Sequence, residues 1–231
     1  MFQQEIEEVT DQQRLSPRGR QDIKQANTNT SANSSRPNTR SINSQGSLER
    51  LQTLKKMHNL SMIAILEPFS DNSHINTCKI QLNMEQAYCN NNGKIWLFWN
   101  SDMKCNILEV EDQHITCELN HVECNAKFLV TFIYAKCKEH LRRPLWDKLI
   151  HYSNKEEPWC IIGDFNVITS TDEKLGGLPY NMNKIFDFLS MIETCGLIDI
   201  GYNGQHFTWC NQRSERARVW KRLDRALVND K

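Results

Sequence analysis

The sequence predicts an α+β domain that follows a polar arm. Several short apolar runs separated by turn residues are typical of strands, and two longer segments with apolar side chains every three to four positions are typical of helices. Strands that follow one another through short turns favour one sheet packed on another. At 231 residues, the chain is long enough for one sizeable domain and a tail.

The arm is expected at residues 1–46, which are rich in Gln, Asn, Ser, Thr and Arg. Such a composition cannot bury enough apolar surface to offset the entropy lost on ordering, so we expect this segment to be disordered. Hydrophobic residues make up 39% of the whole chain and are concentrated in the remainder. The folded domain is therefore predicted over residues 47–231.

The first half of the domain is predicted to contain one helix and four strands. The helix over residues 47–58 has Ser47 as its cap and carries apolar side chains at helical spacing. The Asn-Asn-Asn-Gly turn at residues 90–93 predicts a hairpin. The expected strands cover residues 62–66, 94–99, 114–119 and 127–134.

The second half is predicted to contain two helices around a central strand. Pro144 is placed in the first turn of a short amphipathic helix, and an apolar strand begins at Trp159. A longer helix over residues 182–195 ends before Gly196, which suits a C-terminal stop. Its apolar stripe is predicted to consist of Met182, Ile185, Phe186, Leu189 and Ile192, with Met191 off the stripe.

The C-terminal end combines aromatic and basic residues. Strand-like runs at residues 207–209 and 219–220 are expected to place their aromatic side chains in the second sheet, with stacking on bases as the alternative. The net charge of the chain is zero, so no global field indicates a nucleic-acid partner. A local basic segment fits either a DNA phosphate backbone or a solvated charged face. Its members are Arg213, Arg216, Arg218, Lys221, Arg222 and Arg225.

Two polar residues, Asp164 and Asn166, close the apolar run that starts at Trp159. If strand geometry persists, they face one side of the strand while Phe165 faces the other. A carboxylate and a carboxamide on one side can hold a water and a phosphate oxygen together. The alternative is a strand exit in which both side chains satisfy local backbone groups.

Five motifs in chain order give a more specific interpretation. They are Gly-Asp-Phe-Asn at 163–166, Glu-Lys-Leu-Gly-Gly at 173–177, Cys-Gly-Leu-Ile-Asp at 195–199, Phe-Thr-Trp-Cys-Asn at 207–211 and Arg-Leu-Asp-Arg-Ala-Leu at 222–227. With these motifs the sequence resembles the endonuclease/exonuclease/phosphatase superfamily, and within it the apurinic-type endonuclease domain of plant non-LTR (LINE) retrotransposons. The resemblance covers about residues 38–231. It implies a four-layer α/β/β/α sandwich.

The resemblance also implies a Mg²⁺-dependent attack of water on the phosphate backbone of DNA, with Mn²⁺ as the alternative ion. In this reaction Asp164 would prepare the water, while Asn166 and Tyr134 would bind the phosphate. Glu67, at a strand end, matches the metal ligand of the family. Asp224 matches the carboxylate that orients a catalytic histidine. Without the resemblance, Glu67 suits a surface cap and Tyr134 a core aromatic residue.

The sequence departs from the family pattern in two places. Asn38 matches an asparagine of the metal and phosphate network, but polar residues and Pro37 replace the apolar strand that should carry it. The Ser-Asp-His sequence that supplies the catalytic histidine does not occur before Lys231. We therefore expect a domain that is truncated at both ends. Since loss of one charge-stabilising group typically costs about 10²- to 10³-fold in rate, we expect weak or no turnover.

Cysteine use and hydropathy bear on the setting of the chain. Its nine cysteines form no C-x-x-C pair, which favours reduced thiols in the nucleus or cytoplasm over a secreted protein. No run of about eighteen apolar residues indicates a membrane span. The sequence indicates no obligate protein partner.

Two alternatives to a DNA endonuclease stay open. The chain could be a non-catalytic remnant, or a basic module that binds nucleic acid. It could also be a phosphatase or phospholipid phosphodiesterase of the same superfamily, because a fold does not define its substrate.

Overall fold

Strand-forming runs build two large sheets and one small sheet in the computed structural model, which describes residues 42, 44–123 and 126–231. The first large sheet has the order β4-β5-β6-β7-β12-β9, and the second has the order β1-β3-β2. The strands of the first are β4 (Met103–Val110), β5 (His114–His121), β6 (Lys127–Tyr134), β7 (Trp159–Asp164), β9 (Ile198–Asp199) and β12 (Asp224–Val228). Those of the second are β1 (Met62–Leu66), β2 (Gln86–Cys89) and β3 (Ile95–Trp99). The small sheet joins β8 (Lys174–Leu175), β10 (Trp209–Cys210) and β11 (Trp220–Lys221).

Four α-helices are described, together with short 3-10 helices. The α-helices are α2 (Gln45–His58), α3 (Ile75–Gln81), α4 (Glu139–Tyr152) and α5 (Phe186–Thr194). The 3-10 helices are η2 (Asn72–His74), η3 (Thr171–Glu173), η4 (Met182–Ile185) and η5 (Glu215–Ala217). No helix of the described ranges is long and apolar enough to cross a membrane.

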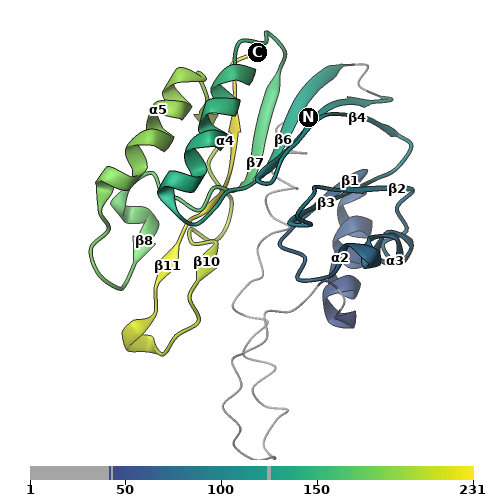
Figure 1. Cartoon of the computed structure of the whole chain (residues 1–231). Coiled ribbons are helices and arrows are strands. Elements are labelled where there is room, and N and C mark those ends of the chain that lie inside the picture. Colours follow the sequence, from purple (N-terminus) through teal and green to yellow (C-terminus); the bar gives the residue numbers. More distant parts are fainter. Residues whose placement is uncertain (1–41, 43, 124–125) are drawn as a thin grey trace, which may run out of the picture.

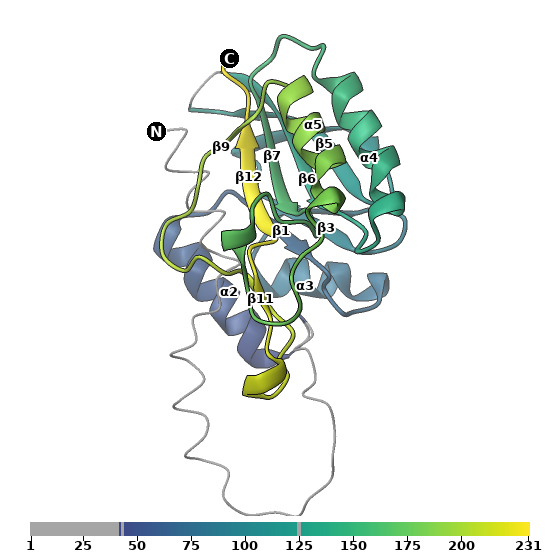
Figure 2. The ribbon, with the colours of Figure 1, turned by 90° about the vertical axis from the view of Figure 1, so that its left-hand side faces the viewer.

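The helices and the two large sheets form four layers (Figure 1). Helices α4 and α5 cover one face of the six-stranded sheet, and the β1-β3-β2 sheet lies against its other face (Figures 1 and 2). Helices α2 and α3 cover the outside of that second sheet. The predicted α/β/β/α architecture is therefore confirmed.

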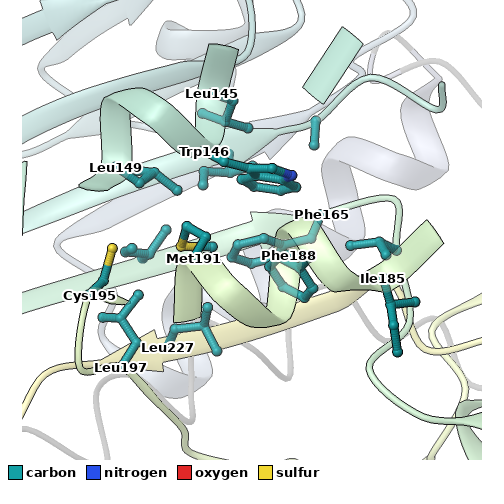
Figure 3. Close-up of a cluster of buried hydrophobic side chains, with 14 of the residues drawn as sticks. Leu145, Trp146, Leu149, Phe165, Ile185, Phe188, Met191, Cys195, Leu197 and Leu227 are labelled. Carbon is teal, nitrogen blue, oxygen red and sulfur yellow. The ribbon is translucent and has the colours of Figure 1, made fainter. Parts of the chain in front are cut away.

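Each interface between layers has its own apolar cluster. Under α4 and α5, the rings of Trp146, Phe165 and Phe188 stack with centroids 5.1 to 6.3 Å apart (Figure 3). Between the sheets, Ile95 and Leu97 of β3 face side chains of β5, β6, β7 and β12. The alternate residues of β3 face α2 and α3, so this strand is buried on both sides. Its unbroken apolar sequence follows from that double burial.

The predicted strands agree well with the structure. The expected strands at residues 62–66 and 127–134 coincide with β1 and β6, and the hairpin expected around the 90–93 turn joins β2 to β3. These runs were predictable because alternating or continuous apolar residues need no distant partner to define a strand.

Gly163 allows β7 to lie close to β6. Its φ is +143°, a conformation that favours glycine. A Cβ atom at this position would lie 2.0 Å from the carbonyl oxygen of Ile133. The glycine therefore permits β6 and β7 to run side by side up to their ends, where Tyr134 pairs with Asp164.

The N-terminal boundary of the packed region differs from the prediction. Ser44, not Ser47, caps α2, because its side chain accepts a hydrogen bond from the Ser47 N–H. Ile42 is buried against the apolar cluster under α2, and its N–H donates to the Pro68 carbonyl at 3.0 Å. Packing thus reaches residues that the sequence assigns to the arm; residues 1–41 and 43 lie outside the described ranges.

Two predicted helix details are wrong. Helix α4 begins at Glu139, so Pro144 lies inside it rather than in its first turn. The earlier start buries the Arg142 side chain, which bonds to carbonyls beyond the helix. In α5, Met191 is fully buried and points into the cluster with Trp146, whereas Phe186 is exposed (Figure 3). The segment begins with the 3-10 helix η4, which has fewer residues per turn than an α-helix, so a different set of side chains faces the core. The spacing of apolar residues alone does not reveal such a start.

The aromatic residues near the C-terminus do not fill the second large sheet, contrary to expectation. Trp209 and Trp220 lie instead in the small β10-β11-β8 sheet. Trp209 is 40% exposed, and the Lys221 ammonium lies 5.6 Å from its ring. Short strands of two residues bury little, because they have no second layer over both faces.

Candidate active site

The ends of three neighbouring strands bring Tyr134, Asp164 and Asp224 side by side. In the register of the sheet, Asp164 pairs with Tyr134 of β6 and with Asp224 of β12. The residues two positions away, such as Ile162 and Ala226, belong to the apolar cluster between the sheets. Because side chains alternate along a strand, all three polar groups face the second sheet. They line one end of the interface between the two large sheets.

Glu67 reaches the same place from the second sheet. It directly follows β1, has a φ of +50°, and donates its N–H to the Lys94 carbonyl at 2.8 Å. Burial raises the pKa of the Tyr134 phenol, and hydrogen bonding to Glu67 raises it further. The Glu67 carboxylate and the Tyr134 hydroxyl are therefore close enough to interact. Four of the predicted site residues, Glu67, Tyr134, Asp164 and Asp224, thus converge.

Negative charge is concentrated at this position. Burial raises the pKa of Asp164 to about 8, and the charges of Asp224 and Glu67 contribute to the increase. Burial likewise raises the pKa of Asp224, although a hydrogen bond with Thr208 opposes that change. A carboxylate whose pKa is raised by neighbouring carboxylates lacks enough positive charge nearby. The site favours a proton or a cation.

Asn166 leaves the strand direction and is held by its own contacts. Strand β7 ends at Asp164, and Asn166 has a φ of +53°. Its N–H donates to the Asp164 Oδ1 at 2.8 Å, which is the local backbone bond of the alternative interpretation. Its Nδ2 donates to the Ala135 carbonyl at 2.7 Å. Phe165 turns to the opposite face, as expected, and packs under α4.

The side-chain oxygen of Asn166 stays largely available. The thiol of Cys137 donates to Oδ1 over 3.6 Å, and a thiol is a weak donor. Asn166 therefore lies next to Asp164 but is oriented by its bond to the loop after β6. Strand alternation, on which the prediction depended, does not orient it.

The donor set fits a hard divalent cation. Mg²⁺ prefers oxygen ligands, keeps several waters and often takes only one or two protein carboxylates. Glu67 and Asp164 offer such carboxylates in a region of excess negative charge. In the described part of the chain, no group of three or more His, Cys, Asp or Glu side chains forms a metal site. Asn38, the remaining predicted member of the network, lies outside the described residues.

Asp224 has no histidine partner within the described ranges, which include all seven histidines. The side chains that affect the pKa of its carboxyl are Thr208 and Arg225. His206, the histidine nearest in sequence to a motif, stacks between the rings of Tyr202 and Phe207 at 5.1 and 4.8 Å.

Part of the predicted basic segment is buried, so neither of its two interpretations, a DNA-binding surface or a solvated charged face, holds for the whole segment. The exposed fractions of Arg222 and Arg225 are 7% and 1%. Both pair with Glu173 and Asp199 at 2.7 to 2.9 Å. We call these four residues the buried ion network. Arg213 and Arg216 remain exposed on the turn between β10 and β11.

Two cations near the site are not evident from the sequence. The Lys94 Nζ lies 3.4 Å from the Glu67 Oε1, on a half-exposed pair. The Arg142 Nη1 donates to the carbonyls of Lys136, Cys137 and Asn166 at 3.0 to 3.2 Å. The first had no sequence signal, because its partner Glu67 lies 27 residues away in the chain. The second had no sequence signal, because its partners are backbone groups.

Comparisons with known proteins address the fold. No protein-family model and no curated protein sequence matches the chain. The endonuclease domain of TRAS1, a telomere-specific non-LTR retrotransposon, is similar with a TM-score of 0.57 and 10% identity, over 78% of each chain. The 3′ phosphatase NExo from Neisseria, bound to a product DNA hairpin, is similar with a TM-score of 0.57 and 14% identity. The match covers 82% of this chain and 83% of that chain. An endonuclease/exonuclease/phosphatase family protein from Bacteroides thetaiotaomicron is similar with a TM-score of 0.51 and 13% identity. The match covers 79% of this chain and 74% of that chain. Identities of this size show a common fold.

Proposed function

Because the chain has the endonuclease/exonuclease/phosphatase fold, we propose that it is a Mg²⁺-dependent phosphodiesterase domain that cleaves the phosphate backbone of DNA, in the manner of a non-LTR retrotransposon endonuclease. The observation that carries the proposal is the convergence of Glu67, Tyr134, Asp164 and Asp224 at one end of the sheet interface. Two sheets contribute these groups, and the fold has no structural need for so many carboxylates at one point. The finer features of this proposal, including a plant LINE origin and action in the nucleus or cytoplasm, rest on the sequence motifs.

Each residue has a role that its surroundings support. Asp164 takes the proton of the attacking water, and Tyr134 donates a hydrogen bond to a phosphate oxygen. The Asn166 amide nitrogen carries two hydrogens, so beside its bond to Ala135 it has one left to donate to the phosphate. Glu67 would hold Mg²⁺, or Mn²⁺ in its place, which would stabilise the charge that develops on the phosphate while Asp164 acts as the base. Asp164 needs its ionised form for this role, and its neighbours disfavour that form until positive charge arrives.

We further propose that this chain alone cleaves slowly. Asp224 faces Asp164 without a histidine to share its proton. Removing one charge-stabilising group from such a site typically costs about 10²- to 10³-fold in rate. A non-catalytic module that binds nucleic acid is the alternative, which a complete lack of nicking would favour.

A plasmid-nicking assay tests the proposal. Supercoiled plasmid is incubated with the wild-type chain in Mg²⁺, in Mn²⁺ and in EDTA, alongside Asp164→Ala. We expect slow nicking by the wild-type chain that stops in EDTA and in the variant. Nicking that is equal in the variant would refute the assignment. Hydrolysis of a sugar phosphate or a phosphoinositide without any nicking would favour the phosphatase alternative, which the likeness to a 3′ phosphatase keeps open.

Lys94 is expected to compete with the divalent cation for Glu67. Its ammonium lies 3.4 Å from the Glu67 carboxylate, where a unit charge in a watery environment contributes about 1 kcal/mol, or roughly fivefold in affinity. Lys94→Met should therefore bind Mn²⁺ about fivefold more tightly, as measured by isothermal titration calorimetry. Lys136→Met is the matched control, because that ammonium is similarly exposed and lies near Asp112 instead. Equal affinities of the wild-type chain and Lys94→Met would contradict this prediction.

A further inference from the structure

Arg142 is a buried cation without a carboxylate partner. Its exposed fraction is 3%, and no Asp or Glu lies within salt-bridge distance of it among the described residues. Its Nε has no hydrogen-bond partner in that part of the chain. Burial of an unpaired charge is costly, so most buried arginines pair with an acid. The arrangement around Arg142 must provide something other than ion pairing.

The guanidinium joins two loops that leave the sheet next to the candidate active site. Its Nη1 donates hydrogen bonds to the carbonyls of Lys136 at 3.1 Å and Cys137 at 3.0 Å, in the loop after β6. The same nitrogen donates to the carbonyl of Asn166 at 3.2 Å, in the loop after β7. The first loop follows Tyr134 directly, and the second contains Asn166. One nitrogen therefore sets the spacing between the segments that carry the two phosphate-binding side chains.

The Asn166 backbone depends on this contact. Its φ of +53° is uncommon for a residue with a side chain. Its N–H bonds to Asp164, its side-chain amide to Ala135 and its carbonyl to Arg142. Without Arg142 the carbonyl would lose its partner, and the unfavourable backbone conformation would be held by fewer bonds.

The charge of Arg142 also acts on the site. Its guanidinium is among the groups that lower the pKa of Asp164, against the larger effect of burial. Arg142 is thus a buried positive charge that partly offsets the acidic cluster.

We propose that Arg142 is a positioning residue, which fixes the loops after β6 and β7 so that Tyr134 and Asn166 present their donors to the same phosphate. The proposal rests on the proposed phosphodiesterase function. Arg143 provides the natural comparison, because it is the next residue of α4, is 60% exposed and pairs with Asp187 on α5 at 2.8 Å.

The experiment combines kinetics with amide hydrogen exchange in Arg142→Met, Arg142→Lys and Arg143→Met. Misplacement of catalytic groups by about 1 Å costs on the order of 10²-fold, so Arg142→Met should lower kcat by about that factor with a smaller change in KM. Arg142→Lys keeps the charge but not the planar set of guanidinium donors, so its kcat should lie between that of the wild-type chain and that of Arg142→Met. Arg143→Met should match the wild-type chain.

Hydrogen exchange distinguishes positioning from general stability. The amides of Lys136 and Asn166 are bonded to side chains, at 2.7 and 2.8 Å, and should exchange faster in both Arg142 variants. The amides of β5, within the core, should keep their wild-type rates. Unchanged exchange in the two loops would overturn the proposal, and so would faster exchange throughout the domain. If Arg142→Met does not fold, the exchange of Arg142→Lys decides the question. Should the wild-type chain cleave no substrate, local loosening would still support the positioning role, while the proposed function itself would fail.

Discussion

Asp164→Asn is expected to remove phosphodiester cleavage and, at the same time, to stabilise the protein above neutral pH. Loss of a general base typically costs about 10²- to 10⁴-fold in rate. The substitution keeps the Oδ1 acceptor for the Asn166 N–H, so the loop should stay in place. The two effects share one cause, namely a carboxylate held where its charge is unfavourable.

The direction of the pH effect follows from the pKa of Asp164. In the folded protein this pKa is raised from 3.8 to about 8, so the folded state binds a proton more tightly than the unfolded state. The contribution of Asp164 to folding stability is then highest below about pH 4 and falls as the pH rises towards 8. Asparagine cannot ionise and escapes this loss.

Thermal unfolding in EDTA at pH 4.5 and pH 8.5 measures the effect. We expect a smaller difference in Tm between wild type and Asp164→Asn at the lower pH, which lies just above the ordinary pKa of 3.8. At the higher pH the variant should melt about 4–8 °C higher, which corresponds to about 2 kcal/mol in a domain of this size. Asp147→Asn on the exposed side of α4 is the matched control and should show neither effect. A variant that is less stable than wild type at pH 8.5 would show that the Asp164 charge is well compensated.

Arg225→Met is expected to destabilise the domain by about 3–5 kcal/mol, the usual cost of removing one partner from a buried ion pair. The Arg225 side chain is fully buried, bonds to Glu173 and Asp199 at 2.9 Å each, and lies over the ring of Phe188. Its loss leaves the Glu173 carboxylate buried with fewer donors. Methionine keeps most of the volume, so the loss reports on charge rather than on packing.

The pH dependence of this loss identifies its source. Although burial raises the pKa of Glu173, hydrogen bonds and charges of Arg225 and Arg222 lower it to about 2. The stability that Glu173 contributes is therefore present above its ordinary pKa of 4.5 and disappears as the pH falls towards 2.

Urea unfolding at pH 7 and pH 3 compares Arg225→Met with wild type. The difference in unfolding free energy should be largest at pH 7 and smaller at pH 3. Arg216→Met, on the exposed turn, should leave stability unchanged. A loss below about 1 kcal/mol at pH 7 would indicate that water solvates the network as it does a surface ion pair.

Sequence patterns located the strands better than they located the charged groups. Strands β1, β6 and β7 were predicted because their apolar residues alone define them. The roles of Arg222 and Arg225 were predicted wrongly, because each is set by acids more than twenty residues away in the chain. A charge count along the sequence cannot tell a solvated arginine from a buried one.

The candidate site shows the same division. The family resemblance predicted Glu67, Tyr134, Asp164 and Asp224 as site residues, and the structure brings all four to one end of the sheet interface. The sequence did not identify Lys94 or Arg142. The partner of Lys94 is Glu67, which is distant in the chain, and the partners of Arg142 are three backbone carbonyls.

By itself, then, the sequence determined which segments are strands, which side chains end those strands and which known motifs they match, because these are local properties of the chain. Only the tertiary structure decided that β7 lies between β6 and β12, and hence that Asp164 has Tyr134 on one side and Asp224 on the other. It also decided where charge is buried. Burial and register depend on packing between distant segments, and the same carboxylate that would be an ordinary acid on a surface has its pKa raised to about 8 at this interface.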